Sequence, residues 1–123
     1  MSNDLVEFFE RTKTELKERG RTVGRLYDKG TGCVCLLGAM GFAAGIDLTI
    51  DESITMEGVA SRVPGAVNLL SELISEDYKY GLDYDYEVMF NPVWRFNDRN
   101  GRGQQGDERV NALLDQAIAA ASA

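Results

Sequence analysis

Hydrophobic side chains recur at helical spacing near both ends of the chain. Between residues 4 and 19 one face of a helix would hold Leu5, Phe8, Phe9, Thr12 and Leu16. Residues 107–121 show the clearest pattern, with nonpolar side chains at 110, 113, 114, 117, 118 and 121. Shorter patterns predict helices over 55–62 and 65–77, whereas residues 82–105 show no clear period. The chain is therefore expected to be mainly helical.

A turn and two β-favouring residues precede the apolar centre of the chain. Val23 and Tyr27 favour extended backbone. Residues 28–32 contain two glycines, which allow the positive φ of a tight turn. Together these features predict a small β-hairpin over residues 22–35.

The apolar run from Cys33 to Gly45 is rich in glycine. Gly38, Gly41 and Gly45 would share one face of a helix. Each glycine in a helix interior costs roughly 1 kcal/mol relative to alanine, and close packing usually offsets that cost. The sequence thus predicts a buried, glycine-rich central helix. The expected fold is mainly α (α+β), a compact single domain over residues 1–123 with one small hairpin.

Charge and composition narrow the classes of partner. The 123 residues carry a net charge of −7, with 44% hydrophobic and 27% charged residues. Nonspecific binding to nucleic acid or to anionic lipid needs a basic surface, so neither is expected, whereas a basic protein partner remains open. The N-terminus is polar and does not resemble a signal peptide, and the longest apolar run, 33–46, is shorter than the roughly 20 residues of a membrane span. A cytoplasmic protein is expected.

The absence of histidine removes several kinds of catalytic site. It excludes Ser-His-Asp and Cys-His nucleophile pairs and the HExxH zinc motif. Two cysteines alone are too few for a structural zinc site, which needs four Cys or His ligands. Carboxylate chemistry with magnesium or calcium stays open, but no cofactor, metal ligand or catalytic residue is assigned.

Cys33 and Cys35 are the first candidate for chemistry. They form either a reactive thiol pair or two small buried hydrophobic residues. A reactive thiol needs a positive neighbour or a helix N-terminus, and Arg25 is near in sequence. Without histidine to act as a base, the buried alternative is favoured.

The second candidate is an acidic, tyrosine-rich segment over residues 76–87. Asp83, Asp85 and Glu87 alternate with Tyr84 and Tyr86, so an extended strand would place carboxylates on one face and rings on the other. It does not match a calcium-binding EF-hand loop, because Val88 occupies the position of the glycine. Either it is a surface for a basic partner, or it is a solvated strand whose rings face the core. The second alternative is favoured.

The third candidate is the polar segment before the last helix, with Asn97 and Asp98 among three arginines. Those arginines are Arg95, Arg99 and Arg102. Such residues bind a ligand or satisfy backbone groups as turns and caps. The structural role is favoured, as a cap for the last helix.

Two blocks of residues resemble an uncharacterised family of small actinobacterial and actinobacteriophage proteins. The first is Gly20-x-Thr-x-Gly24 followed by Cys35-Leu-Leu-Gly-Ala39, and the second is Phe96-Asn97-Asp98 followed by Gly101-Arg102 and the last helix. The chain departs from the usual pattern of that family in three places. Arg21 and Phe96 replace tryptophans, and residues 103–107 look like an insertion that removes a threonine cap. The resemblance implies a compact helical domain and no known activity.

These observations predict a small intracellular phage or bacterial accessory protein that binds another macromolecule, a host protein with a basic surface. The binding residues would be Asp83, Tyr84, Asp85, Tyr86 and Glu87. One alternative is an enzyme or small-ligand sensor with its site between the Cys35 helix and loop 97–102. That site would comprise Arg25, Cys35, Asn97, Asp98 and Arg102. Another alternative is a homo-oligomeric structural component.

Overall fold

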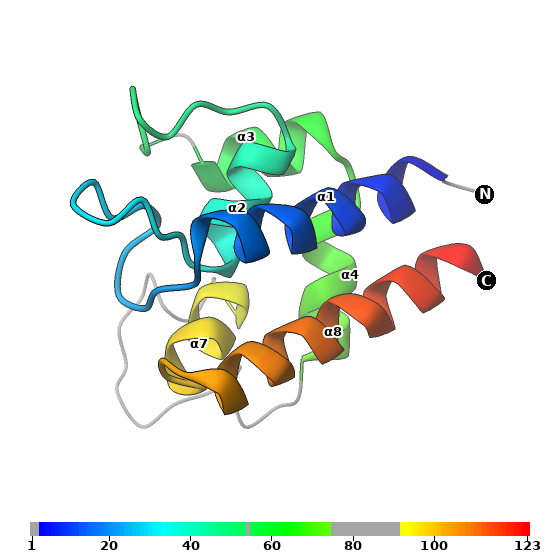
Figure 1. Ribbon diagram of the computed structural model, residues 1–123. Coiled ribbons are helices and arrows are strands. Elements are labelled where there is room, and N and C mark those ends of the chain that lie inside the picture. Colours follow the sequence, from blue (N-terminus) through cyan, green and yellow to red (C-terminus); the bar gives the residue numbers. More distant parts are fainter. Residues whose placement is uncertain (1–2, 54, 75–91) are drawn as a thin grey trace.

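The chain folds as a set of helices packed around one central helix (Figure 1). The structure, a computed structural model, describes residues 3–53, 55–74 and 92–123. In these residues the helices are α1 (Asn3–Arg19), α2 (Leu36–Ala43), α3 (Thr55–Arg62), α4 (Ala66–Leu73), α7 (Pro92–Arg99) and α8 (Gln104–Ser122). The expected mainly helical class is confirmed.

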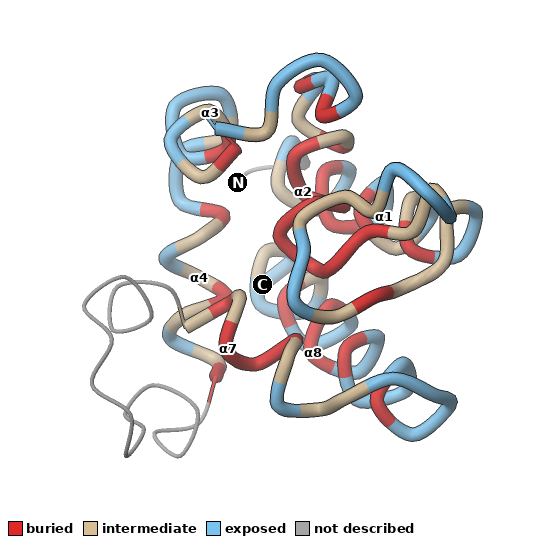
Figure 2. The backbone as a smooth tube through the Cα atoms, turned by 90° about the vertical axis from the view of Figure 1, so that its left-hand side faces the viewer, coloured by how far each residue is buried: buried red, intermediate tan, exposed pale blue. Residues whose placement is uncertain are grey.

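The first and last helices lie side by side and antiparallel (Figure 1). Phe8, Phe9 and Leu16 of α1 are buried, as are Val110 and Leu114 of α8, because the apolar faces predicted from the spacing turn inward. Figure 2 shows the buried positions gathered where the helices face one another. Both predicted helices are confirmed, and α8 begins three residues earlier than expected, at position 104.

Helix α2 is the buried centre of the fold. Seven of its eight residues are buried, and it packs against α1, α3 and α7. A Cβ atom at Gly38 would overlap the backbone carbonyl of Leu26, and one at Gly41 would lie 2.8 Å from Leu48 Cδ1. The prediction of close packing against a glycine face is correct for these two residues. It is wrong for Gly45, which follows the helix with φ +88° and has nothing near its missing Cβ.

The predicted β-hairpin over residues 22–35 is wrong. Within the described residues Val34 forms only isolated bridges, one parallel with Arg21 and one antiparallel with Tyr27. The turn itself is present, since Gly32 N donates to Asp28 O at 2.7 Å. No ladder extends from it, because Val34 is shared between two short segments and a positive φ at Gly24 interrupts the backbone between them.

Helix α7 lies in the segment for which no helix was expected. Its buried face is formed by Val93, Phe96 and Asn97, at the spacing of one helical face, and Arg95 is also buried. Pro92 occupies its first position, where a missing N–H is harmless. The segment 97–102 therefore consists of the last turn of α7 and part of a short connection, rather than one loop. Helix α4 confirms residues 66–73 of the helix predicted over 65–77, and 75–77 lie outside the described residues.

Candidate functional site

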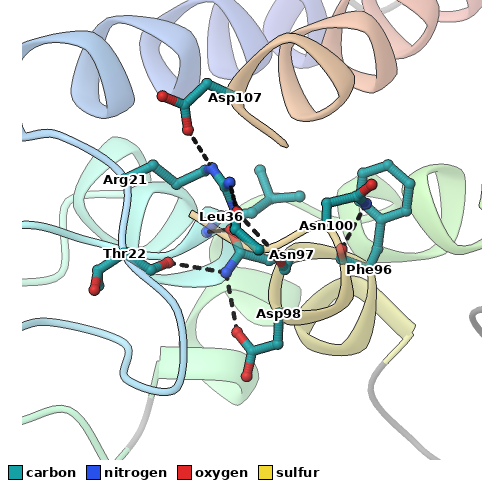
Figure 3. Close-up of polar contacts among 9 residues, drawn as sticks. Arg21, Thr22, Leu36, Phe96, Asn97, Asp98, Asn100 and Asp107 are labelled. Carbon is teal, nitrogen blue, oxygen red and sulfur yellow. Dashed lines mark hydrogen bonds and ion pairs between the residues drawn. The ribbon is translucent and has the colours of Figure 1, made fainter. Parts of the chain in front are cut away.

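Asn97 on α7 joins three parts of the chain (Figure 3). It is fully buried, and its Oδ1 accepts hydrogen bonds from Leu36 N at 3.0 Å and from Arg21 Nη1 at 3.1 Å. Its Nδ2 donates to Thr22 O and to Asp98 Oδ1, both at 3.0 Å. Leu36 is the first residue of α2, and the first N–H groups of a helix have no acceptor inside that helix. The amide of Asn97 thus holds the start of α2 against the segment that precedes it.

The expected capping role of Asn97 and Asp98 therefore falls on a different helix. Residue Gly103 precedes α8 and makes no side-chain cap hydrogen bond. Asp98 Oδ1 instead accepts a hydrogen bond from Gly24 N at 3.0 Å. Both side chains project from α7 toward residues 22–36, so they satisfy backbone groups there and not in the helix that follows them.

Arg21 ties the same segment to the start of α8. Its side chain is only 3% exposed, and its Nε lies 2.6 Å from Asp107 Oδ1, whose side chain is 50% exposed. Its Nη1 donates to Asn97 O at 3.0 Å, and its Nη2 donates to Gly101 O. The planar guanidinium thus meets four acceptor atoms on three residues at once, which a lysine ammonium on a flexible stem would not reproduce.

Two segments that were expected to depart from the pattern of the resembled family meet at this point. Arg21 is one, and residues 103–107 are the other, and the ion pair with Asp107 joins them. Gly106 leaves room for the guanidinium, because a Cβ there would overlap Arg21 Nη2 and would lie 2.5 Å from Asn100 O. Residues 103–107 therefore supply both the ion-pair partner of Arg21 and the space that its guanidinium occupies.

Cys35 is the N-terminal capping residue of α2. It is fully buried at the N-terminus of α2, and its Sγ accepts a hydrogen bond from Gly38 N at 3.4 Å. Burial raises the pKa of the Cys35 thiol from 9.0 to about 11, so the thiol is neutral at physiological pH. Cys33 is half-buried, and both cysteines are free.

The structure brings together four of the five residues of the expected ligand site. Cys35, Asn97, Asp98 and Arg102 surround the segment before α2, with Arg102 Nη2 3.4 Å from Thr22 Oγ1. Arg25 is exposed and makes no hydrogen bond with any of them. Within the described residues no buried side-chain nitrogen or oxygen atom lacks a partner. The two sequence blocks that resemble the family therefore meet in space. They form a structural junction whose buried polar side-chain atoms all have hydrogen-bond partners.

Arg25 lines a separate hollow of about 880 Å³. One part of the lining is apolar and comes from α2, α3, α7 and the segment between α2 and α3. It consists of Leu37, Leu48, Met56 and Trp94. The rest of the lining is formed by two loops, residues 24–30 and 50–53, in which Leu26, Tyr27, Asp28 and Glu52 are half-buried and the other residues are exposed.

Ile50 stands at this hollow with 81% of its surface exposed. It is the one large hydrophobic side chain that is exposed in the described part of the chain. Its loop is held by two turns, in which Asp47 Oδ1 accepts from Thr49 N at 3.0 Å and Asp51 Oδ1 accepts from Ser53 N at 2.8 Å. The Ser53 hydrogen bonds hold the pKa of Asp51 below its ordinary value. The exposed isoleucine is thus presented by an ordered loop.

Sequence reasoning missed this hollow. The signal that was available is an isoleucine without a helical partner in the polar run Asp47-Leu-Thr-Ile-Asp-Glu-Ser53. The binding residues expected in the acidic segment, Asp83, Tyr84, Asp85, Tyr86 and Glu87, lie outside the described residues.

Two further observations bear on the site. Across residues 3–53, 55–74 and 92–123, no group of three His, Cys, Asp or Glu side chains is placed to hold a metal ion. In the same residues no helix has the length and apolar character to cross a membrane.

Comparison with known proteins identifies a family without assigning an activity. No curated protein matches the chain, and no solved structure does. The model of a family of unknown function, DUF6197, matches residues 1–120. The match spans nearly the whole sequence and agrees with the resemblance to an uncharacterised family. The chain belongs to the DUF6197 family of unknown function.

Proposed function

We propose that the protein is a small intracellular accessory protein of a phage or bacterium and that it acts by binding a host protein. The observation that carries this proposal is Ile50, exposed at the mouth of a hollow with an apolar interior. A hollow that combines an apolar lining with a few polar groups is the usual form of a binding site. The phage or actinobacterial origin rests on the resemblance of the two sequence blocks alone.

The hollow has the composition of a protein-binding site. Trp94 and Met56 belong to residue types that are enriched at interfaces, and Arg25 is a third. Charged side chains surround apolar ones, as in interfaces where a polar rim encloses a hydrophobic centre. The net charge of −7 favours a partner with a basic surface.

The enzyme alternative has less support at its expected position. The lining of the hollow that contains Arg25 includes neither Cys35 nor Asn97, and the raised pKa of Cys35 opposes its use as a nucleophile. A small-ligand sensor that uses the hollow instead remains the second candidate, because about 880 Å³ lies within the volume range of ligand pockets. Binding through residues 83–87 stays a prediction.

The test places a photo-crosslinking residue at position 50 and, as a matched control, at position 111. Asn111 is exposed on α8, away from the hollow. Crosslinking in host lysate followed by mass spectrometry identifies a protein attached at 50 but not at 111. That protein is then purified, and its affinity is measured for the wild type, Ile50→Asp and Asn111→Asp.

We expect Ile50→Asp to weaken binding about tenfold or more, because a central hydrophobic contact is replaced by a charge that must be desolvated. Asn111→Asp should change the affinity less than twofold or so, as expected for a residue outside the contact. Equal binding by the wild type and Ile50→Asp, both with unchanged melting temperature, would show that the hollow is not the binding site.

A further inference from the structure

The two loops that line the hollow carry opposite net charges. Loop 24–30 contributes Arg25 and Lys29, and loop 50–53 contributes Asp51 and Glu52. Asp28 also belongs to the first loop, where its Oδ1 accepts a hydrogen bond from Gly30 N at 2.9 Å and so serves the turn. Loop 24–30 therefore carries a net charge of +1, and loop 50–53 carries a net charge of −2.

These charged side chains are unpaired among the described residues. The ion pairs there are Lys13–Asp115, Arg19–Glu15 and Arg21–Asp107, none of which involves the mouth of the hollow. Among the described residues the Asp51 carboxylate accepts hydrogen bonds only from Ser53, whose N and Oγ both donate to Oδ1. The four charges are therefore free to meet complementary charges on a partner.

We propose that the hollow binds an extended peptide segment of the partner that carries one bulky apolar side chain between a basic and an acidic residue. The apolar side chain enters the space beside Leu48, Met56 and Trp94. The basic residue lies by Asp51 and Glu52, and the acidic residue lies by Arg25 and Lys29. This inference rests on the proposed protein-binding function and specifies the chemistry of the segment that is bound.

The charge pattern favours this occupant over simpler ones. An acidic ligand meets Asp51, Glu52 and the overall charge of −7, which repel it. A purely basic segment pairs with Asp51 and Glu52 but is repelled by Arg25 and Lys29. A neutral apolar molecule fills the interior and leaves the exposed charges without partners. Only a segment with both signs complements both loops.

The single tryptophan of the chain reports directly on occupancy. Trp94 lines the hollow, and the sequence contains no other tryptophan, so its fluorescence follows binding there. The probes are tryptophan-free peptides of equal length with a central leucine. Their flanking charges are Lys and Glu in either order, Lys and Lys, or Glu and Glu. A fifth peptide has Lys and Glu around a central serine.

We expect one of the mixed-charge peptides to bind most tightly, about two- to fivefold better than the Lys–Lys peptide, since exposed ion pairs are individually weak. The Glu–Glu peptide should bind least among the leucine peptides, and the serine peptide should give no saturable signal. Added salt should reduce the differences between the charge patterns, because the paired charges are exposed to solvent.

Charge-reversal variants make the prediction specific. Arg25→Glu combined with Lys29→Glu should shift the preference to the Lys–Lys peptide. Glu52→Lys should shift it toward the Glu–Glu peptide, and it leaves Asp51 to hold its turn. Lys17→Glu, at an exposed lysine of α1 that does not line the hollow, is the matched control and should shift nothing.

Equal affinities for the charge patterns, or the same preference in all variants, would overturn this inference. So would the absence of saturable binding by any peptide at millimolar concentration. If a host protein still crosslinks at position 50 and is lost with Ile50→Asp, the proposed function survives that failure. If no protein depends on Ile50, the proposed function fails independently of the peptides.

Discussion

Replacing Asn97 with alanine should destabilise the fold more than any exposed substitution. The change removes four hydrogen bonds from the interior. Two of the partners are backbone groups, the N–H of Leu36 and the carbonyl of Thr22, and both bonds are buried. Neither group gains another partner when the amide is deleted.

The expected loss follows from those two groups. A buried backbone group that loses its partner costs about 1–3 kcal/mol, so two such groups cost roughly 2–6 kcal/mol. Alanine is the better helix former, which returns about 0.5 kcal/mol at this position in α7. The remaining loss of about 2–5 kcal/mol is a large share of the 5–15 kcal/mol that stabilises a typical domain.

Urea unfolding followed by circular dichroism measures this loss. Asn111→Ala is the control, because Asn111 is an exposed asparagine of α8, and its change should stay within about 0.5 kcal/mol. A free energy of unfolding for Asn97→Ala within 1 kcal/mol or so of the wild type would refute the reasoning. It would mean that water or another side chain satisfies Leu36 N and Thr22 O.

Two further predictions concern the central helix. Gly38→Ala should lower the free energy of unfolding by about 3 kcal/mol or more, because the new Cβ overlaps the Leu26 backbone. Gly41→Ala should lower it clearly less, because its Cβ meets only the ends of side chains. A Gly38→Ala variant more stable than the wild type would contradict this packing. The raised pKa of Cys35 means that the stability contributed by its buried thiol is fully present below about pH 9 and is lost as the pH rises toward about 11. The free energy of unfolding should therefore fall by about 2 kcal/mol more in the wild type than in Cys35→Ala between pH 8 and 10.5. Equal pH dependence, or rapid labelling of Cys35 by Ellman's reagent in native protein, would contradict it.

The elements that could be predicted from the sequence are the helices whose buried faces consist of apolar side chains. Helices α1 and α8 each repeat hydrophobic residues over several turns, so their pattern alone predicts both the helix and its buried face. The glycines at 38 and 41 also gave a correct prediction, since only a close neighbour explains two such residues within one helix.

Helix α7 could not be predicted in this way, because its buried face includes a polar residue. Asn97 is buried since its partners, Thr22 and Leu36, come from segments more than 60 positions earlier in the chain. A pattern of neighbouring residues carries no information about such partners. The same limit explains the hairpin, where Val34 pairs with two segments that the local β-favouring pattern treats as one strand.

The candidate site shows a similar division. Composition indicated that Asn97, Asp98 and Cys35 act on structure, and their hydrogen bonds agree. Asn97 and Asp98 were expected to cap α8, because they precede it in the chain, but the fold brings Asn97 to the start of α2 and Asp98 to the backbone of Gly24. The hollow at Ile50 depends on the approach of two loops, which no spacing in the sequence specifies.

The structural junction and the hollow are connected through the segment that follows Arg21. Asn97 holds the Thr22 carbonyl and Asp98 holds the Gly24 N–H, so the loop that begins at residue 24 starts from two points anchored to α7. The same helix contributes Trp94 to the interior of the hollow. Helix α7 therefore fixes the position of Trp94 inside the hollow and also the point at which loop 24–30 begins. The position of this loop relative to Trp94 does not depend on the conformations of the Arg25 and Lys29 side chains. A preformed hollow of this kind loses less conformational entropy on binding than one that must assemble around its ligand. The polar residues that looked like a ligand site in the sequence thus support the neighbouring surface on which we propose that binding takes place.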